Sequence, residues 1–197
     1  MSAGLDGRIA IMVSGRGSNL HALLERARLR DKLGWIGPVI SDNPDAAALK
    51  RAHDSGIETL VVDPGTCADR TQFEHHVNCH LVQRDCKWVL LAGFMRILSD
   101  DFVAEWAGRI VNIHPSLLPA WRGLNTHARV LQAGCQTHGC SIHLVNEAID
   151  DGPVLAQAKL IITPELRNAE QLGAAVLRLE HQLYAEVLDW ILAGTLS

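Results

Sequence analysis

The sequence predicts an α/β protein whose mostly parallel, twisted sheet carries helices on both faces. Short apolar segments rich in branched side chains alternate with amphipathic segments over the first 114 residues. These apolar segments are nearly continuous, which is typical of parallel strands buried on both faces. The later part of the chain breaks the pattern and predicts an antiparallel element.

The expected elements follow from local signals along the chain. Ser18-Asn19 is a good helix N-cap, Pro44 suits the first turn of a helix, and Gly56 suits a helix end. Apolar runs predict strands over 8–14, 35–41, 57–62, 87–92 and 109–114. Amphipathic spacing predicts helices over 18–33, 44–55, 71–86 and 100–107.

The last third is expected to hold a pair of strands and one long helix. Residues 140–145 alternate between apolar and polar, and 154–162 follow across a turn, so we expect a hairpin-like pair near one sheet edge. Residues 167–193 have the spacing of a long amphipathic helix. We expect one domain over 1–197, with 1–7 as a flexible N-terminal extension.

Composition favours a soluble, cytoplasmic, globular protein and does not exclude an anionic small-molecule ligand. The chain has 197 residues and a net charge of −4, which argues against a general nucleic-acid binder. No apolar run approaches the roughly 18 residues needed to cross a membrane, and residues 1–7 do not resemble a secretory signal. Five cysteines without a CxxC motif fit free thiols in a reducing compartment. We expect a monomer or a homodimer without membrane partners.

Asn112 and His114 are the strongest catalytic candidates. They alternate at the end of an expected strand, so both side chains point the same way, and the segment 115–119 then leaves through two prolines. Asp150 and Asp151 form an acidic turn that can fold back and stabilise the imidazolium. An amide, an imidazole and a carboxylate suit acyl transfer without a covalent intermediate. Spacing alone does not choose between the two aspartates, and a histidine in such a place is often structural.

The turn over residues 14–19, SGRGSN, is a candidate phosphate site. Its backbone N–H groups converge at an expected helix N-terminus, where anions bind well. The dinucleotide motif GxGxxG and the motif GxxxxGK[ST] are both absent. A tight turn that needs glycine for backbone reasons alone is the alternative.

Cysteine and histidine residues over 135–143 have the spacing of a zinc cluster. Cys140 and His143 stand three apart in an alternating strand, so their side chains would point to opposite faces. We therefore expect no metal.

Six stretches together resemble a known family. They are SGRGSNL (14–20), AGFMRILS (92–99), NIHPSLLP (112–119), HGCSIH (138–143), DDGPV (150–154) and LEHQLY (179–184). Over roughly 8–193 the chain resembles the folate-dependent phosphoribosylglycinamide formyltransferases, also called glycinamide ribonucleotide (GAR) transformylases. The resemblance implies a Rossmann-like, formyltransferase-type fold and formyl transfer from the co-substrate 10-formyltetrahydrofolate to the amine of GAR in purine synthesis.

The resemblance also implies a role for each matching residue. The catalytic residues would be Asn112, His114 and Asp150. GAR would contact Gly17, Ser18, Asn19 and Glu180. The folate would contact Arg70, Met95, Arg96, Ile97, Leu98, Asn112, Asn146, Glu147, Ala148, Ile149 and Asp150.

The chain departs from the family pattern at three places. Asp151 stands where glycine is common, and Asn125 stands where histidine often occurs. The segment 120–123, AWRG, looks more like the loop of methionyl-tRNA formyltransferases. A methionyl-tRNA formyltransferase-like or formyltetrahydrofolate deformylase-like enzyme is therefore the alternative. The SGRGSN turn, the acidic charge and the lack of an expected C-terminal RNA-binding domain disfavour the first, and the lack of an expected N-terminal regulatory domain disfavours the second.

Two further classes explain less of the sequence. A nucleotide-binding module without catalysis would explain the glycine turn but would leave Asn112, His114 and Asp150 without a purpose. A dinucleotide-dependent oxidoreductase lacks its fingerprint.

Overall fold

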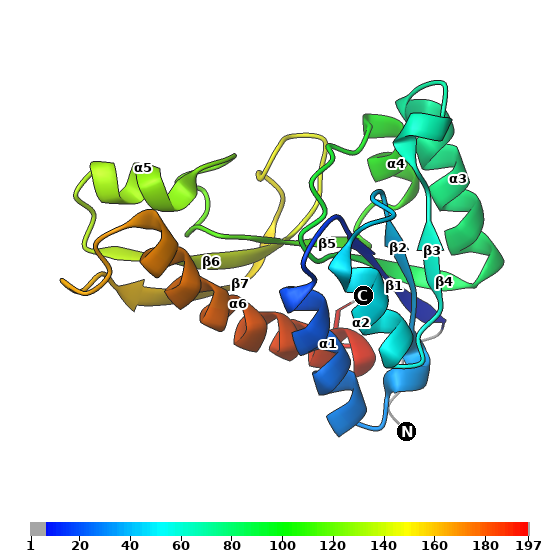
Figure 1. Ribbon diagram of the computed structural model, residues 1–197, viewed down its shortest axis with the longest axis horizontal. Coiled ribbons are helices and arrows are strands. Elements are labelled where there is room, and N and C mark those ends of the chain that lie inside the picture. The colour runs from blue at the N-terminus through cyan, green and yellow to red at the C-terminus, as the bar shows by residue number, and fades with distance from the viewer. Residues whose placement is uncertain (1–6, 197) are drawn as a thin grey trace.

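The computed structural model describes residues 7–196 as one seven-stranded sheet flanked by helices (Figure 1). The strands are β1 (Arg8–Val13), β2 (Ile36–Ser41), β3 (Thr59–Val61), β4 (Cys86–Leu91), β5 (Ile110–His114), β6 (Thr137–Leu144) and β7 (Val154–Ile161). The α-helices are α1 (Ser18–Leu29), α2 (Ala47–Asp54), α3 (Arg70–Gln83), α4 (Asp100–Glu105), α5 (Thr126–Gln132) and α6 (Ala169–Leu192). The expected extension over 1–7 lies, except for Gly7, outside the described residues.

The sheet order is β3-β2-β1-β4-β5-β6-β7. Strands β1 to β5 pair in parallel, and β6 and β7 are antiparallel. This confirms the predicted fold class and the hairpin at the edge. Figure 1 shows β6 and β7 extending away from the parallel strands, with α5 beside them. The chain order reverses between β1 and β4, and ligands of open α/β sheets bind outside the carboxyl ends of the strands at such a point.

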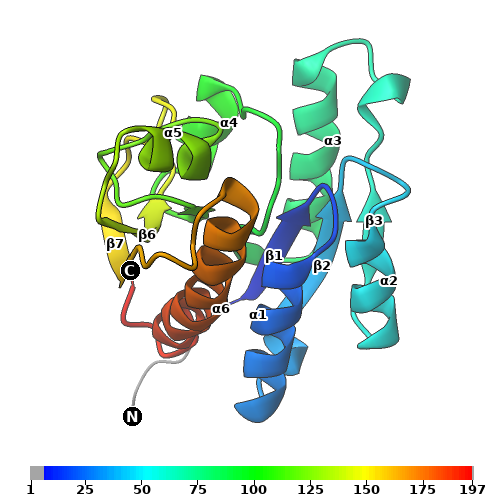
Figure 2. The ribbon, with the colours of Figure 1, turned by 60° about the vertical axis from the view of Figure 1, so that its left-hand side comes forward.

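Two hydrophobic cores lie on opposite faces of the sheet. In β1, Ile9, Ile11 and Val13 join the core under α1, α2 and α6, whereas Ala10 and Met12 join the core under α3 and α4. Figure 2 shows α1 and α6 on the face of the sheet opposite α3. Burial on both faces explains why β1 reads as a continuous apolar run.

The start of α1 differs from the expected cap. Gly17, not Ser18 or Asn19, occupies the N-cap position, with φ 72°, and no side chain caps the helix. A Cβ at Gly17 would lie 2.6 Å from the Cβ of Ala48, so α2 packs directly against this turn. Similarly, Pro44 lies in a turn before α2 rather than within its first turn. The uncapped N–H groups of α1 stay available to a ligand.

Tyr184 fixes α6 against the neighbouring strands β4 and β5. Its hydroxyl group lies 3.2 Å from the carbonyl oxygen of Leu91 and 3.1 Å from that of Val111, and the side chain is fully buried. Burial raises the pKa of this phenol well above its usual value. Glu180 stands one helical turn earlier, so this anchor also positions Glu180.

Over residues 7–196, no helix is long and apolar enough to cross a membrane.

Candidate functional site

A cavity of about 660 Å³ opens at the carboxyl edge of the sheet. Its walls come from four parts of the chain: the segment after β4, the end of β5, the loop before α5 and the loop between β6 and β7. The lining includes Gly93–Leu98, Asn112–Pro115, Gly123–His127 and Val145–Asp150. This volume is in the range of ordinary small-molecule pockets.

His114 lies at this cavity with an oxygen acceptor at each ring nitrogen. Nδ1 is 3.2 Å from Oδ2 of Asp150, and Nε2 is 3.1 Å from the carbonyl oxygen of Trp121. Because both partners only accept hydrogen bonds, the arrangement is satisfied when both nitrogens carry protons. Of the two aspartates, Asp150 faces the ring, whereas Asp151 pairs with Arg122.

Asn112 is oriented by His143, a residue not expected at the site. Nδ1 of His143 lies 2.9 Å from the Leu144 carbonyl oxygen, so Nδ1 carries the proton. Burial lowers the pKa of His143, which favours the neutral ring. Its Nε2 can then accept from the Asn112 amide nitrogen at 3.2 Å. The amide nitrogen is thereby fixed, and its second N–H is left for another acceptor.

The sequence contained only a weak signal for His143. Its motif, HGCSIH, belongs to the family resemblance, but the only role that the residue spacing suggests for His143 is that of a metal ligand. The antiparallel register sets His143 directly opposite Asn112, and Ser141 opposite His114. That register depends on how β6 docks, which strand alternation does not reveal.

The residues expected at GAR come together from the two ends of the chain. The Asn19 amide nitrogen donates to a Glu180 carboxylate oxygen at 2.8 Å, across α1 and α6. Burial raises the pKa of Glu180. Oδ1 of Asn19 is buried and has no hydrogen-bond partner among the described residues. The turn is tied to the large cavity, because Met95 N–H donates to the Ser14 hydroxyl at 2.9 Å.

Most residues expected at the folate line the large cavity. These are Met95, Arg96, Ile97, Leu98, Asn112, Asn146, Glu147, Ala148, Ile149 and Asp150. Met95, Ile97 and Ile149 are 72%, 62% and 55% exposed, an apolar rim that a ligand could cover. Arg70 differs: it is exposed in the first turn of α3 and is not among the described residues that line the cavity.

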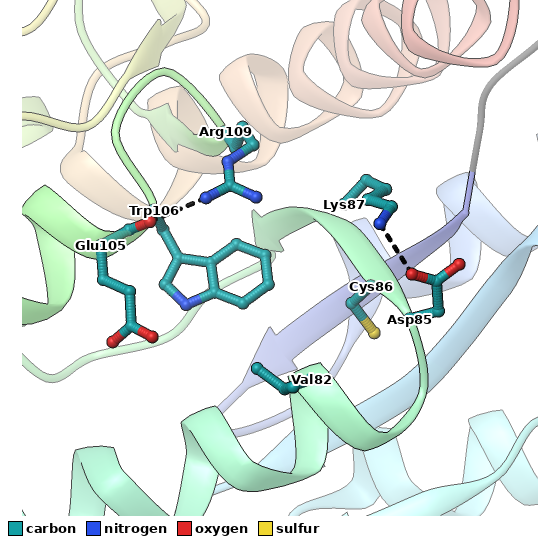
Figure 3. A pocket seen from close by; sticks show the side chains of 7 residues that line it. All are labelled: Val82, Asp85, Cys86, Lys87, Glu105, Trp106 and Arg109. Carbon is teal, nitrogen blue, oxygen red and sulfur yellow. Dashed lines mark hydrogen bonds and ion pairs between the residues drawn. The ribbon is translucent and has the colours of Figure 1, made fainter.

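A second cavity, of about 200 Å³, lies near the start of β4, away from this site (Figure 3). Its charged side chains already have partners: the Glu105 carboxylate accepts from the Asn78 amide nitrogen at 2.6 Å. Lys87 pairs with Asp85 at 2.7 Å, and the Arg109 guanidinium lies over the Trp106 ring and donates to the Glu105 carbonyl oxygen. None of the catalytic candidates lines it.

The histidines of the zinc-like spacing over 135–143 contact other side chains. His138 lies 2.9 Å from His127, ring nitrogen to ring nitrogen, and His143 contacts Asn112. Over the described part of the chain, no group of three or more His, Cys, Asp or Glu side chains could hold a metal ion.

Comparison with known proteins identifies the family. A family model described as "Formyl transferase" matches residues 7–188. The phosphoribosylglycinamide formyltransferase of Escherichia coli is 37% identical over 96% of this chain and 89% of its own length. The trifunctional purine biosynthetic protein adenosine-3 of Gallus gallus is 35% identical over 96% of this chain, which spans only 19% of that protein.

A solved structure is similar over the same extent. The phosphoribosylglycinamide formyltransferase of Coxiella burnetii, in complex with CHES, superposes with a TM-score of 0.87 at 43% identity, covering 95% of this chain and 87% of that one. These findings confirm the resemblance inferred from the six motifs. The chain belongs to the formyl transferase family, among its phosphoribosylglycinamide formyltransferases.

Proposed function

We propose that the protein transfers the formyl group of 10-formyltetrahydrofolate to the amine of 5'-phosphoribosylglycinamide in de novo purine synthesis. The observation that carries this proposal is the convergence of Asn112, His114 and Asp150 at one end of a large cavity. The phosphate of GAR would bind at the uncapped start of α1, through Gly17 and Ser18. Asn19 and Glu180 would bind the rest of that substrate.

The folate would occupy the large cavity. The apolar rim of Met95, Ile97 and Ile149 supports this assignment, because a planar ring system would remove these side chains from water. Backbone groups of 95–98 and 146–150 would supply the polar contacts. Arg70 would act only through the more distant part of the folate, since it lies outside the cavity lining.

The transfer would proceed by direct attack. The neutral GAR amine adds to the formyl carbon, and the resulting oxyanion is held by the free N–H of Asn112 and the positive charge of His114. Asp150 keeps His114 protonated and, through water, helps move the proton from the attacking nitrogen to N10 of the folate. The bond between the formyl carbon and N10 then breaks, which releases tetrahydrofolate and formyl-GAR.

The test follows tetrahydrofolate formation with GAR and 10-formyltetrahydrofolate. We expect His114→Ala to lower kcat by about 10²–10³-fold with little change in KM, and Asp150→Asn to cost more than Asp151→Asn. His53→Ala, on the exposed end of α2, is the matched control. Near-normal turnover of His114→Ala would remove the catalytic assignment.

The same assay separates the alternatives. Tetrahydrofolate released without GAR would indicate a deformylase, and formylation of methionyl-tRNA but not of GAR would indicate the enzyme suggested by the segment 120–123. We further propose that residues 1–197 act as one formyltransferase domain, monomeric or homodimeric. The five unpaired cysteines support a cytoplasmic location.

A further inference from the structure

Two loops enclose the imidazole of His114. The loop before α5 contributes the carbonyl oxygen of Trp121, 3.1 Å from Nε2. The loop between β6 and β7 contributes the carboxylate of Asp150, 3.2 Å from Nδ1. The ring is therefore aimed correctly only while both loops hold their places.

The two loops are also bonded directly to each other. The N–H of Gly123 donates to Oδ2 of Asp150 at 2.9 Å, the same oxygen that faces His114. Beside this bond, one residue before Gly123 and one residue after Asp150, the Arg122 guanidinium forms an ion pair with the Asp151 carboxylate. This pair has no other acidic or basic side chain within ion-pair distance among the described residues.

The backbone of both loops requires such support. Trp121 has φ 62° and Asp150 has φ 51°, left-handed conformations that a non-glycine residue rarely keeps unless its surroundings hold it there. On its far side the first loop is held by Arg129 of α5, which donates to the Arg122 carbonyl oxygen at 2.6 Å and covers the Trp121 ring. On the side that faces the second loop, the first loop is held by the hydrogen bond to Asp150 and the ion pair with Asp151.

Both members of the ion pair stand where the chain departs from the pattern noted in its sequence. Arg122 belongs to the unusual AWRG segment, and Asp151 replaces a common glycine. Neither side chain reaches the reacting groups: each is 41% exposed, and Arg122 and Asp151 face each other. The two departures thus form one contact.

We propose that the Arg122–Asp151 ion pair is a latch that holds the two loops together and so positions Asp150 and the Trp121 carbonyl group against His114. Arg122 and Asp151 are positioning residues in this reading, which rests on the proposed function. A half-exposed ion pair adds little to global stability. Its effect falls on geometry, because a misplacement of an ångström can cost about 100-fold in rate.

The kinetic test is a double-mutant cycle with Arg122→Ala and Asp151→Ala. We expect each single variant to lower kcat by about tenfold with KM for GAR within about twofold, since only aim is lost. The double variant should be no slower than either single variant. The charge swap Arg122→Asp with Asp151→Arg should recover part of kcat. Arg28→Ala, which breaks a comparably exposed pair with Glu25, should change nothing.

Amide hydrogen exchange supplies a readout that does not depend on activity. Both single variants should lose protection over 120–125 and 146–151, including the Gly123 amide, with the melting temperature nearly unchanged. Unchanged exchange and kcat in an active enzyme, or additive losses in the double variant, would overturn the latch. If the wild type fails to formylate GAR but the variants still lose protection, the latch stands and the proposed function fails.

Discussion

Glu180 is a buried carboxyl group in the proposed GAR site, and we expect its burial to lower the stability of the protein. It is only 8% exposed, and its one hydrogen-bond partner among the described residues is the amide of Asn19. Burial raises the pKa of this carboxyl group because it disfavours the charged form. Asn19 Oδ1 is also unpartnered. Both groups belong to the proposed GAR site, and a substrate with hydrogen-bond donors would supply the partners that they lack.

We therefore expect Glu180→Gln to stabilise the protein while weakening GAR binding. When the pKa of a carboxyl group is higher in the folded than in the unfolded protein, the free energy of unfolding decreases as the pH rises above the unfolded pKa. The gain should thus be near zero at pH 4 and of the order of 1 kcal/mol at pH 7.5, measured by urea unfolding. KM for GAR should rise about tenfold or more, as for a lost charged hydrogen bond.

The exposed Glu186→Gln on the same helix should change neither quantity. An equal gain for Glu180→Gln at both pH values would contradict the electrostatic explanation.

Among the secondary-structure elements, α2 contacts the turn that precedes α1 (residues 14–19, the candidate phosphate site) and so fixes its shape. The Ala48 N–H donates to the Gly15 carbonyl oxygen at 3.0 Å, and Arg51 donates to the Arg16 carbonyl oxygen at 3.0 Å. Helix α2 thereby both packs against the turn and bonds to it. Glycine is required at position 17 for two reasons, the positive φ and the lack of space.

Comparing Gly17→Ala with Gly108→Ala separates the effect of close packing from the effect of backbone conformation. Both glycines have φ 72°, but nothing lies within 4 Å of a Cβ at Gly108. We expect Gly108→Ala to cost about 1–2 kcal/mol of unfolding free energy and to leave kinetics unchanged. Gly17→Ala should cost about 1–3 kcal/mol more, because Ala48 must move, and should raise KM for GAR. Similar stabilities for the two variants would argue against tight packing at the turn.

Across the whole molecule, the buried histidines set the response to acid. Burial lowers the pKa of His127 and His143, and it lowers that of His138 to about 4. These rings are neutral in the folded protein but take up protons when the chain unfolds below about pH 6.5. Protonation therefore favours the unfolded chain as the pH falls from about 6.5 toward about 4.

The unfolding free energy should decrease over this window by up to about 1.4 kcal/mol per pH unit for each such histidine. Urea unfolding at pH 7.5, 6 and 5 measures this slope. His138→Gln should reduce it, whereas His53→Gln, at an exposed ring, should leave it unchanged. A slope that stays the same in His138→Gln would assign the acid sensitivity to other groups.

The parallel strands, the edge hairpin and the strand-end pair Asn112 and His114 could be predicted because each depends on local periodicity. An apolar run buried on two faces and a period of two are properties of a short segment. The short helix α5 and the earlier start of β6 at Thr137 were not expected. THARVLQ carries little apolar spacing, and β6 lengthens because β7 pairs with it as far as Thr137.

The amino-acid sequence by itself determined the α/β class, the catalytic candidates and, through six motifs, the family. The family resemblance points to Asp150 rather than Asp151, and the tertiary structure places Asp150 against His114. Only the tertiary structure decided that His143 orients Asn112 and that Arg122 meets Asp151. Antiparallel register and loop closure join residues far apart in the chain, and one of the His114 partners is a backbone carbonyl group that every residue possesses. Such contacts leave no local pattern, so they exist only once the sheet has formed.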